Sequence, residues 1–389
     1  MRFIRQSYLP IVSLLSSAAF AEEPAPSVSF SPIAEVRPRA EVRAILDGSE
    51  ALMLVNQRTR LGGTISAGDR VALDVVLQDV RVWGEEADTM KDFSAGGMDL
   101  YVGALRWNPI DPVRFTVGRQ VIAFHEERLV GGVDWAPQGR RFDALRANLG
   151  QGAFSADLVG AVIFEPDTLL YPEDAVVGMV RTGWSPRPAV VVDALYIVDI
   201  DDVVERVRHT TGAYAKMGND VFSARFEGYY QAGELADSVI AAHLLGVSAS
   251  YSPESPLAPK LTLWFDRVSG DENLADTTVG GFDTLFQAGH KFYGRLDLFY
   301  ANPSDPTGRG LHDVAAKFQL APAKGSQLNV DTHVMFAAAG KDGHLGEEVD
   351  IWWTQGFGKH LKFVAGAAAF VPQEGDASLL GWLEMGAKY

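Results

Sequence analysis

The sequence predicts an all-β fold, namely a transmembrane up-and-down antiparallel β-barrel of about 18 strands. Polar and apolar residues alternate with a period of two along most of the 389 residues, which is typical of strands with one apolar face. Short turns rich in Gly, Asn, Asp and Pro alternate with longer acidic connections, as at the two rims of an outer-membrane barrel. Dividing the chain by 18 leaves about 20 residues per strand and connection, enough for the ~9–11 residues that cross a bilayer.

The N-terminus precedes this pattern and predicts export. Arg2 and Arg5 give a positive start, residues 9–20 are mostly apolar, and Ala19-Phe20-Ala21 has the small-x-small form of a cleavage site. We therefore expect residues 1–21 to be a secretory signal peptide and residues 22–389 to form the barrel. A membrane anchor is the weaker alternative because the apolar run is too short to span a bilayer, and no later stretch is long enough either.

The first predicted strand illustrates the alternation. Glu35, Arg37, Arg39, Glu41 and Arg43 alternate with small or apolar residues. Turn residues then separate the following strands in pairs, at 67–69, 108–112, 150–152 and 185–188. These signals predict nine strands in the first half of the chain: 33–44, 51–66, 70–83, 97–107, 113–123, 140–149, 153–164, 176–184 and 189–198.

The second half continues the same pattern. Alternation is clear at 222–231, 260–266 and 313–320, and the turn at 218–220 is again short. Nine further strands are predicted: 206–216, 221–231, 239–251, 260–269, 309–320, 326–338, 348–356, 361–370 and 379–389. The last strand ends on Tyr389, which resembles the terminal signal read by the barrel-assembly machinery. Trp83, Trp107 and Trp184 fall near predicted strand ends, where an aromatic girdle is expected.

Composition and charge exclude several classes of protein. The chain has no cysteine, which removes disulfide frameworks, thiolate metal sites and thiol nucleophiles. A hydrophobic content of 47% argues against disorder, and a net charge of −16 argues against a nucleic-acid partner. The nine long connections hold 30 acids and 5 bases, so the wall and its short turns are net basic, at +7. Because arginine facing lipid at mid-membrane costs ~2–4 kcal/mol, these bases should face the lumen or the rims.

Residues 118–146 read GRQVIAFHEERLVGGVDWAPQGRRFDALR, and residues 282–299 read FDTLFQAGHKFYGRLDLF. The two blocks resemble the bacterial alginate-export family of outer-membrane porins, and weaker similarities occur at 56–62, 79–84 and 346–352. The resemblance implies an 18-stranded barrel in the Gram-negative outer membrane, with an arginine-lined constriction that in the founding member passes alginate. Outer-membrane lipid and lipopolysaccharide would surround it. The longest periplasmic connection, 252–259, has about eight residues, so no sizeable periplasmic plug is expected.

Strand parity selects the residues that should face the lumen. Arg58, Arg60, Arg140, Arg146, Arg206 and Arg208 share the inward parity of their strands, as do Glu348 and Asp350. Pairing with acids would hold the guanidinium groups in place, ready for bidentate contact with sugar carboxylates. Arg128, within a long connection, is expected to fold inward over the pore. Arg119 and Asp143 have outward parity near the outer rim, and we expect them to form a structural pair.

Catalysis is the competing class, and we do not expect an enzyme. His125-Glu126-Glu127 lacks the second histidine of HExxH, and GxSxG, P-loop and GxGxxG motifs are absent. The histidines are scattered without ligand spacing, so no metal or other cofactor is predicted. Loop-bound Ca²⁺ at Asp271, Asp276 and Asp283 is the one alternative, with solvated acids as the simpler interpretation.

These observations predict a channel that passes anionic solutes by diffusion through an arginine-lined pore. Uronate polymers such as alginate are the expected cargo, and a general or solute-specific nutrient porin for small acids or sugars is the alternative. A third class, binding or adhesion through the acidic loops, would be indicated by a barrel that does not conduct ions.

Overall fold

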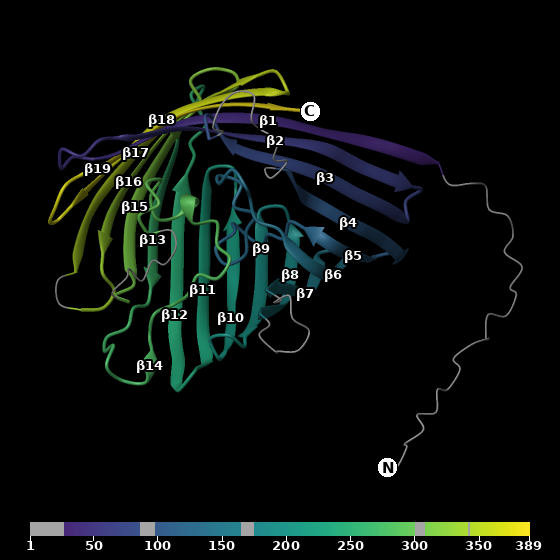
Figure 1. The fold of residues 1–389 in the computed structure, drawn as a ribbon, viewed down its shortest axis with the longest axis horizontal. Helices are drawn as coiled ribbons and strands as arrows, with labels where there is room; N and C mark the ends of the chain where they lie inside the picture. The colour runs from purple at the N-terminus through teal and green to yellow at the C-terminus, as the bar shows by residue number, and fades with distance from the viewer. Residues whose placement is uncertain (1–26, 86–97, 165–174, 300–307, 341–342) are drawn as a thin grey trace, which may run out of the picture.

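The computed structural model describes residues 27–85, 98–164, 175–299, 308–340 and 343–389 (Figure 1). The predicted signal peptide lies outside these residues. The first nine strands are β1 (Val28–Ile45), β2 (Leu52–Ala67), β3 (Val71–Val82), β4 (Met98–Ile110), β5 (Val113–Gln120), β6 (Phe142–Gln151), β7 (Phe154–Phe164), β8 (Ala175–Arg187) and β9 (Val190–Asp201).

The remaining elements are β10 (Arg206–Gly218), β11 (Phe222–Leu235), β12 (Ser238–Tyr251), β13 (Lys260–Val268), the two-residue β14 (Thr278–Val279), the short helix η2 (Gly289–Lys291), β15 (Leu311–Leu320), β16 (Ser326–Phe336), β17 (His344–Phe357), β18 (Leu361–Pro372) and β19 (Ser378–Lys388). Among the described residues, no helix is both long and apolar enough to cross a membrane.

The 18 long strands form one closed antiparallel barrel. Each long strand pairs with the next in sequence, with β13 followed by β15, and β19 returns to pair with β1 from Glu35↔Lys388 to Ile45↔Ser378. Closure leaves no open sheet edge, as a lipid environment requires. The predicted fold and all 18 predicted strands are therefore confirmed.

Some strand ends differ from the prediction. β1 begins at Val28 rather than near residue 33, because its first residues continue to pair with the end of β2, starting at Val28↔Ala67. β17 begins at His344 rather than 348 and contains Gly346 at φ +147°, a conformation that glycine adopts readily. The unpredicted β14 adds a short parallel pairing to β12 inside a long connection.

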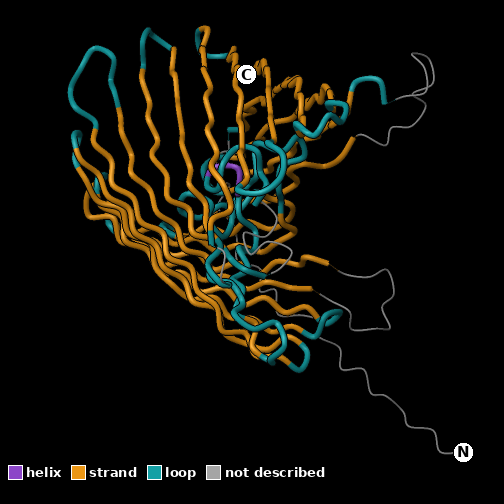
Figure 2. The backbone as a smooth tube through the Cα atoms, turned by 90° about the vertical axis from the view of Figure 1, so that its left-hand side faces the viewer, coloured by secondary structure: helices purple, strands orange, loops and turns teal. Residues whose placement is uncertain are grey.

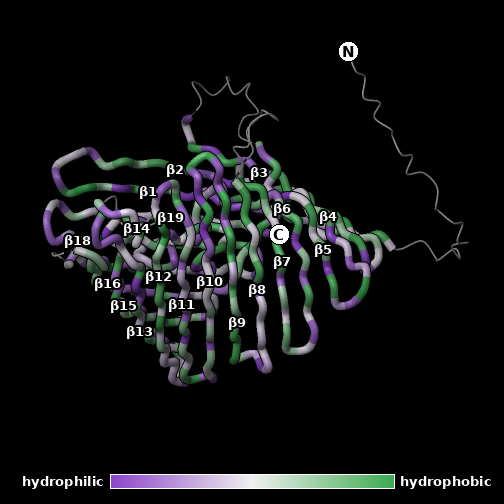
Figure 3. Tube along the Cα trace, turned by 90° about the horizontal axis from the view of Figure 1, so that it is seen from below, coloured by the Kyte–Doolittle hydropathy of each residue, from purple (hydrophilic) through white to green (hydrophobic). Residues whose placement is uncertain are grey.

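The outer surface of the wall is apolar. Leu61, Leu158 and Leu263 are each more than half exposed on this surface, while their polar neighbours are turned inward. Figure 3 shows the resulting alternation of hydropathy along the strands. Trp83, Trp107 and Trp184 are exposed close to strand ends, where an aromatic girdle would lie.

Two long connections fold back into the barrel. We call residues 121–141 and 269–299 the inner loops; the second contains β14 and η2. Figure 2 shows η2 and the loops around it on the concave side of the strands. Both loops leave the rim with the longer connections, and we refer to the opposite rim as the short-turn rim. Short turns are periplasmic in barrels of this kind.

Candidate permeation path

The two inner loops are hydrogen-bonded to each other inside the barrel. The Phe286 N–H donates to the Leu129 carbonyl at 2.8 Å, and the Gly131 N–H donates to the Phe286 carbonyl at 2.9 Å. Their apolar side chains pack into one buried cluster that includes Ile122, Phe124, Leu129, Val130, Phe282, Phe292 and Tyr293. The lumen is therefore narrowed by a packed pair of loops rather than by loose segments.

Arg128 joins this pair of loops to the wall. Its side chain is 1% exposed, and its guanidinium donates to Glu227 of β11 at 2.9 Å, to both carboxylate oxygens of Asp266 of β13 at 2.8 and 2.7 Å, and to the Tyr293 hydroxyl at 2.8 Å. It also lies over the Phe292 ring, 3.8 Å from the centroid. Arg128 folds inward as predicted, but its charge is paired and buried. It therefore holds the inner loops against the wall and does not line open space.

Arg58 and Arg60 on β2 face inward and lie beneath residues 121–141. Arg58 pairs with Glu35 and, at 2.9 Å, with Asp134 of the loop, while Arg60 donates to Gln78 at 2.7 Å. Burial opposes ionisation of Asp134, but Arg58, Arg37 and Arg60 outweigh it and lower its pKa. These arginines hold a loop carboxylate in its charged form, and they are buried instead of lining open space.

Arg37 and Arg39 of β1 were not among the predicted site residues, although they belong to the first alternating strand. Arg37 donates to the Asp134 carbonyl at 2.6 Å, and Arg39 donates to the Trp135 carbonyl at 2.6 Å while stacking on the Trp135 ring. Both therefore dock the same loop through its main chain.

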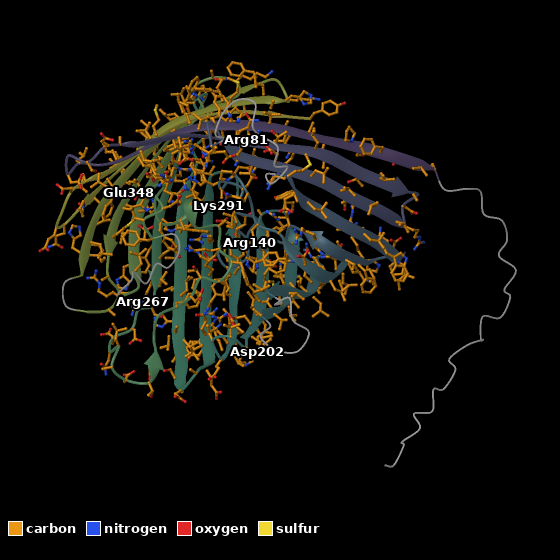
Figure 4. All side chains as sticks on the ribbon, in the orientation of Figure 1. Arg81, Arg140, Asp202, Arg267, Lys291 and Glu348 are labelled. Atoms are coloured by element: carbon orange, nitrogen blue, oxygen red, sulfur yellow. The ribbon has the colours of Figure 1, made fainter. Side chains whose placement is uncertain are left out.

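The other predicted arginines also have partners. Arg146 pairs with Asp157 at 2.6 Å, Arg206 and Arg208 share Asp199, and Arg208 reaches Asp283 of the second inner loop at 2.7 Å. Arg140 donates to the Gln287 carbonyl at 2.9 Å and so bridges the two inner loops. Figure 4 labels Arg140 and Lys291 on these loops and Glu348 on the wall.

Arg119 and Asp143 form the expected pair on the outward face, with two hydrogen bonds of 2.9 and 2.7 Å. Glu348 and Asp350 of β17 are buried and face inward. The three loop aspartates considered for Ca²⁺ have separate partners: Asp271 and Asp276 accept from nearby backbone N–H groups, and Asp283 pairs with Arg208. The fold thus does not gather those three into one group, and Ca²⁺ binding there stays a prediction.

A basic hollow of about 300 Å³ lies on the short-turn side of the inner loops. Its wall residues come from the short-turn halves of the strands from β10 to β17, and Lys291 and Phe292 of the second inner loop form its roof. Its charged lining residues, six bases and two acids, are Lys216, Arg225, Lys260, Lys291, Arg295, Lys317, Glu126 and Asp331. We call this hollow the vestibule. Its formal charge of +4 contrasts with the acidity of the whole chain.

Several vestibule cations remain accessible to a solute. The Lys216 and Lys291 side chains are 50% and 52% exposed, although Glu126 and Glu127 pair with them at 3.0 and 2.7 Å. Lys260 forms no ion pair within the described part of the chain. Lys216 has the same strand parity as Arg206 and Arg208 on β10, whereas the contribution of Lys291 and Arg295 depends on how a long loop folds back, which no local pattern indicates.

A second hollow of about 300 Å³ adjoins the vestibule, because both are lined by Lys291, Arg295 and Trp352. It runs beneath Trp135 and His290, whose rings stack 3.8 Å apart. Burial lowers the pKa of His290 to about 4, so its imidazole is neutral at neutral pH. Water-accessible space therefore follows the loops on their short-turn side, past groups that are mostly basic.

The sequence profile of the alginate export family matches residues 34–378, nearly the whole described barrel. The chain belongs to the alginate export family. The resemblance carried by residues 118–146 is thereby confirmed, and this alginate-export-family barrel is a channel of the outer membrane. Among curated proteins, none matches the sequence significantly.

Solved structures resemble this alginate-export-family barrel in fold. Acinetobacter baumannii OccAB4 is 10% identical with a TM-score of 0.65, and the match covers 94% of this chain and 99% of that one. Pseudomonas aeruginosa OccD3 (OpdP) is 12% identical with a TM-score of 0.63, covering 92% and 91%. Pseudomonas aeruginosa OpdK, solved with vanillate, is 12% identical with a TM-score of 0.64, covering 92% and 98%. At these identities the likeness concerns the fold alone.

Proposed function

We propose that the protein is a passive, anion-selective channel whose cargo carries carboxylates, with uronate polymers such as alginate as the first candidate. The accessible lysines of the vestibule carry this proposal. A ring of one charge concentrates permeants of the opposite sign, and the six bases against two acids at this position make the lining basic. No catalytic role is proposed, and the solute is expected to pass unchanged.

The predicted arginines have a supporting part in this proposal. Because Arg58, Arg60 and Arg128 are buried in ion pairs with wall or loop acids, they fix the loops that shape the passage. Lys216, Lys260 and Lys291 would meet the solute. Lysine is a flexible point charge that releases a hydrated anion more readily than a bidentate arginine does, and a conducting site has to release its permeant.

The first experiment is the reversal potential of the purified protein in a planar bilayer under a KCl gradient. We expect anion selectivity, and the triple variant Lys216→Gln, Lys260→Gln, Lys291→Gln should lose most of it. Lys324→Gln, an exposed lysine on a short turn outside the vestibule, is the matched control and should keep the wild-type value. Cation selectivity of the wild-type channel would refute the proposal.

A nutrient porin for small acids is the second candidate, favoured by the fold likeness to OpdK, whose structure was solved with vanillate. Uronate oligomers of increasing length separate the two. For a polymer channel, current block should become longer-lived as the oligomer lengthens, because successive carboxylates engage several vestibule bases. For a small-acid porin, monomeric aromatic or sugar acids should block and longer oligomers should not.

A further inference from the structure

A buried acidic cluster lies in the lumen wall where β15, β16 and β17 adjoin. It comprises Asp313, Asp331, His333, Glu348 and Asp350, and each of these residues is less than 9% exposed. The strand register brings them together, because Asp331 lies opposite Asp350 and His333 lies opposite Glu348. The Asp331, His333 and Asp350 side chains offer donor atoms that all lie within 4.8 Å of one another.

His333 is oriented as a metal ligand would be. Its Nδ1 lies 2.9 and 3.0 Å from the two carboxylate oxygens of Asp313, so Nδ1–H donates, and in the neutral imidazole Nε2 is then the nitrogen with the lone pair. This Nε2 is buried, has no hydrogen-bond partner and lies 4.0 Å from Asp350 Oδ2. A carboxylate that orients the far side of an imidazole is the arrangement found behind metal-binding histidines.

The carboxylates around His333 are equally unsatisfied. Neither Oδ atom of Asp350 has a hydrogen-bond partner, and neither does Oε2 of Glu348. Buried polar atoms are ordinarily paired, so three unpaired carboxylate oxygens in one place call for a missing partner.

The formal charges of the cluster indicate how much positive charge the missing partner must carry. The four acids of the cluster carry −4, while Lys317, 3.4 Å from Asp331, and the buried Arg295 beside Asp350 supply +2. Buried charge left unneutralised is costly. Two bound protons or one divalent cation would each remove the remaining −2.

We propose that this cluster binds one divalent transition-metal cation, with Zn²⁺ as the expected ion. Asp331, Asp350 and Nε2 of His333 are the ligands, and Asp313 orients the imidazole. A nitrogen ligand disfavours Ca²⁺ and Mg²⁺, which select oxygen, whereas imidazole with carboxylates suits Zn²⁺. Bonds of about 2.1 Å place tetrahedral ligands about 3.4 Å apart, so the side chains need to move inward by about an ångström.

The site is connected to the second inner loop. Glu348 Oε1 accepts the Leu296 N–H at 2.9 Å. Gly294, at φ +84°, lies so close to this carboxylate that a Cβ there would collide with it. Asp331 also lines the vestibule, which gives an ion a route to the site. The cation therefore fixes the wall against which residues 294–296 are held.

The test measures metal binding by the intact barrel in detergent micelles. It needs no conductance measurement, so its outcome is independent of the proposed channel function. After chelator treatment, we expect titration calorimetry and elemental analysis to show one Zn²⁺ per chain and the thermal midpoint to rise on binding. His333→Gln and Asp350→Asn should each lose this binding and this rise. His344→Gln removes a partly exposed rim histidine next to Glu347 and should change neither.

If His333→Gln fails to fold, Asp350→Asn still tests the proposal. Asp350→Asn removes a buried unpaired charge and should therefore stabilise the metal-free barrel. Heat-modifiable migration on gels verifies that each variant is a folded barrel. Absence of Zn²⁺ binding by the wild type would overturn the proposal and indicate that the acids hold protons instead. Binding that survives in both variants would overturn it as well, since the ion would then be elsewhere, for example on the acidic connections.

Discussion

Single arginines in this barrel act mainly as connectors. Arg128 is the most extensively paired of the predicted residues, with two wall carboxylates and a loop hydroxyl around its guanidinium. A buried ion pair gains little over an apolar replacement of the same shape, but removing one partner leaves the other charge stranded. Losing Arg128 would therefore leave Asp266 with only the Trp264 indole N–H at 2.8 Å and the more distant Arg225, whereas Glu227 would keep Arg225 as a partner.

Arg128→Met tests this role. The substitution leaves Asp266 without its main partner, and Arg225 is too distant, at 3.7 Å, to replace both hydrogen bonds. We expect a loss of roughly 3 kcal/mol of docking free energy. The inner loops should detach, and single-channel conductance in a planar bilayer should increase.

The control for that variant is Arg187→Met, an exposed arginine at the end of β8 beside a short turn, which should leave conductance unchanged. Adding Asp266→Asn to Arg128→Met removes the stranded charge and should recover part of the lost stability. Wild-type conductance in Arg128→Met would show that the loops stay in place without this residue.

At the level of elements, the second inner loop carries the buried His290. Three charged groups face His290: Asp297 at 3.0 Å, Arg295 at 2.9 Å and Arg39. Arg295 donates to Nε2, and Nδ1–H donates to Asp297, so the neutral imidazole is the form that the docked loop accommodates.

Loop docking should therefore weaken in acid. An undocked histidine has a pKa near 6.5, whereas burial lowers that of docked His290 to about 4. Above pH 6.5 both states are neutral and docking does not depend on pH. Between pH 6.5 and 4 the undocked state binds the proton, so docking loses stability, on the order of 3 kcal/mol in total. The pKa values of Asp134 and Glu126 are lowered by nearby cations, so these groups remain charged in that range.

Hydrogen–deuterium exchange of residues 284–296 measures this effect, after correction for the intrinsic rate at each pH. Protection should fall from pH 7 to pH 5. His290→Phe keeps a ring beside Trp135 and cannot titrate, so its protection should stay constant over the same range. Equal pH dependence in both proteins would exclude His290 as the cause.

The strands were predictable because their signal is local. Alternation along β1 and β11 can be read from the residues themselves, and the pairing of Arg119 with Asp143 follows from parity and the antiparallel register. The packing of the inner loops was not predictable, since Phe286 meets Leu129 across more than 150 residues. The His333 cluster was missed for the same reason: its acids come from three strands, so no spacing within one segment marks it.

At the level of the whole molecule, closure of the barrel depends on its two ends. The Tyr389 N–H donates to the Ala34 carbonyl at 2.8 Å, and the Ala34 N–H donates to the Tyr389 carbonyl at 3.2 Å. The Tyr389 ring stacks on His360, 5.5 Å between centroids. Tyr389 thus extends the pairing of β19 with β1 and presents an exposed aromatic ring at the short-turn rim.

Tyr389→Ala should lower the yield of assembled barrel in cells, because it removes the exposed aromatic ring that we expect the barrel-assembly machinery to read. The measurement is the heat-modifiable fraction in isolated outer membranes. Tyr251→Ala removes a comparable stacked ring, 5.0 Å from Phe222 on the same rim, and should assemble normally. Both variants should refold in detergent. A Tyr389→Ala protein that assembles as well as the wild type would exclude this role.

At four points the wall holds the inner loops by their main chain. Arg37, Arg39, Gln78 and Gln231 donate to the carbonyls of Asp134, Trp135, Gln138 and Asp283 respectively. A carbonyl is the same whichever side chain its residue carries, so this attachment tolerates substitutions along the loops. Loop side chains other than those paired with the wall, such as Arg128, Asp134 and Asp283, can then be exchanged while the scaffold stays constant, and an engineer can graft a new loop sequence of equal length that keeps these three residues without redesigning the strands.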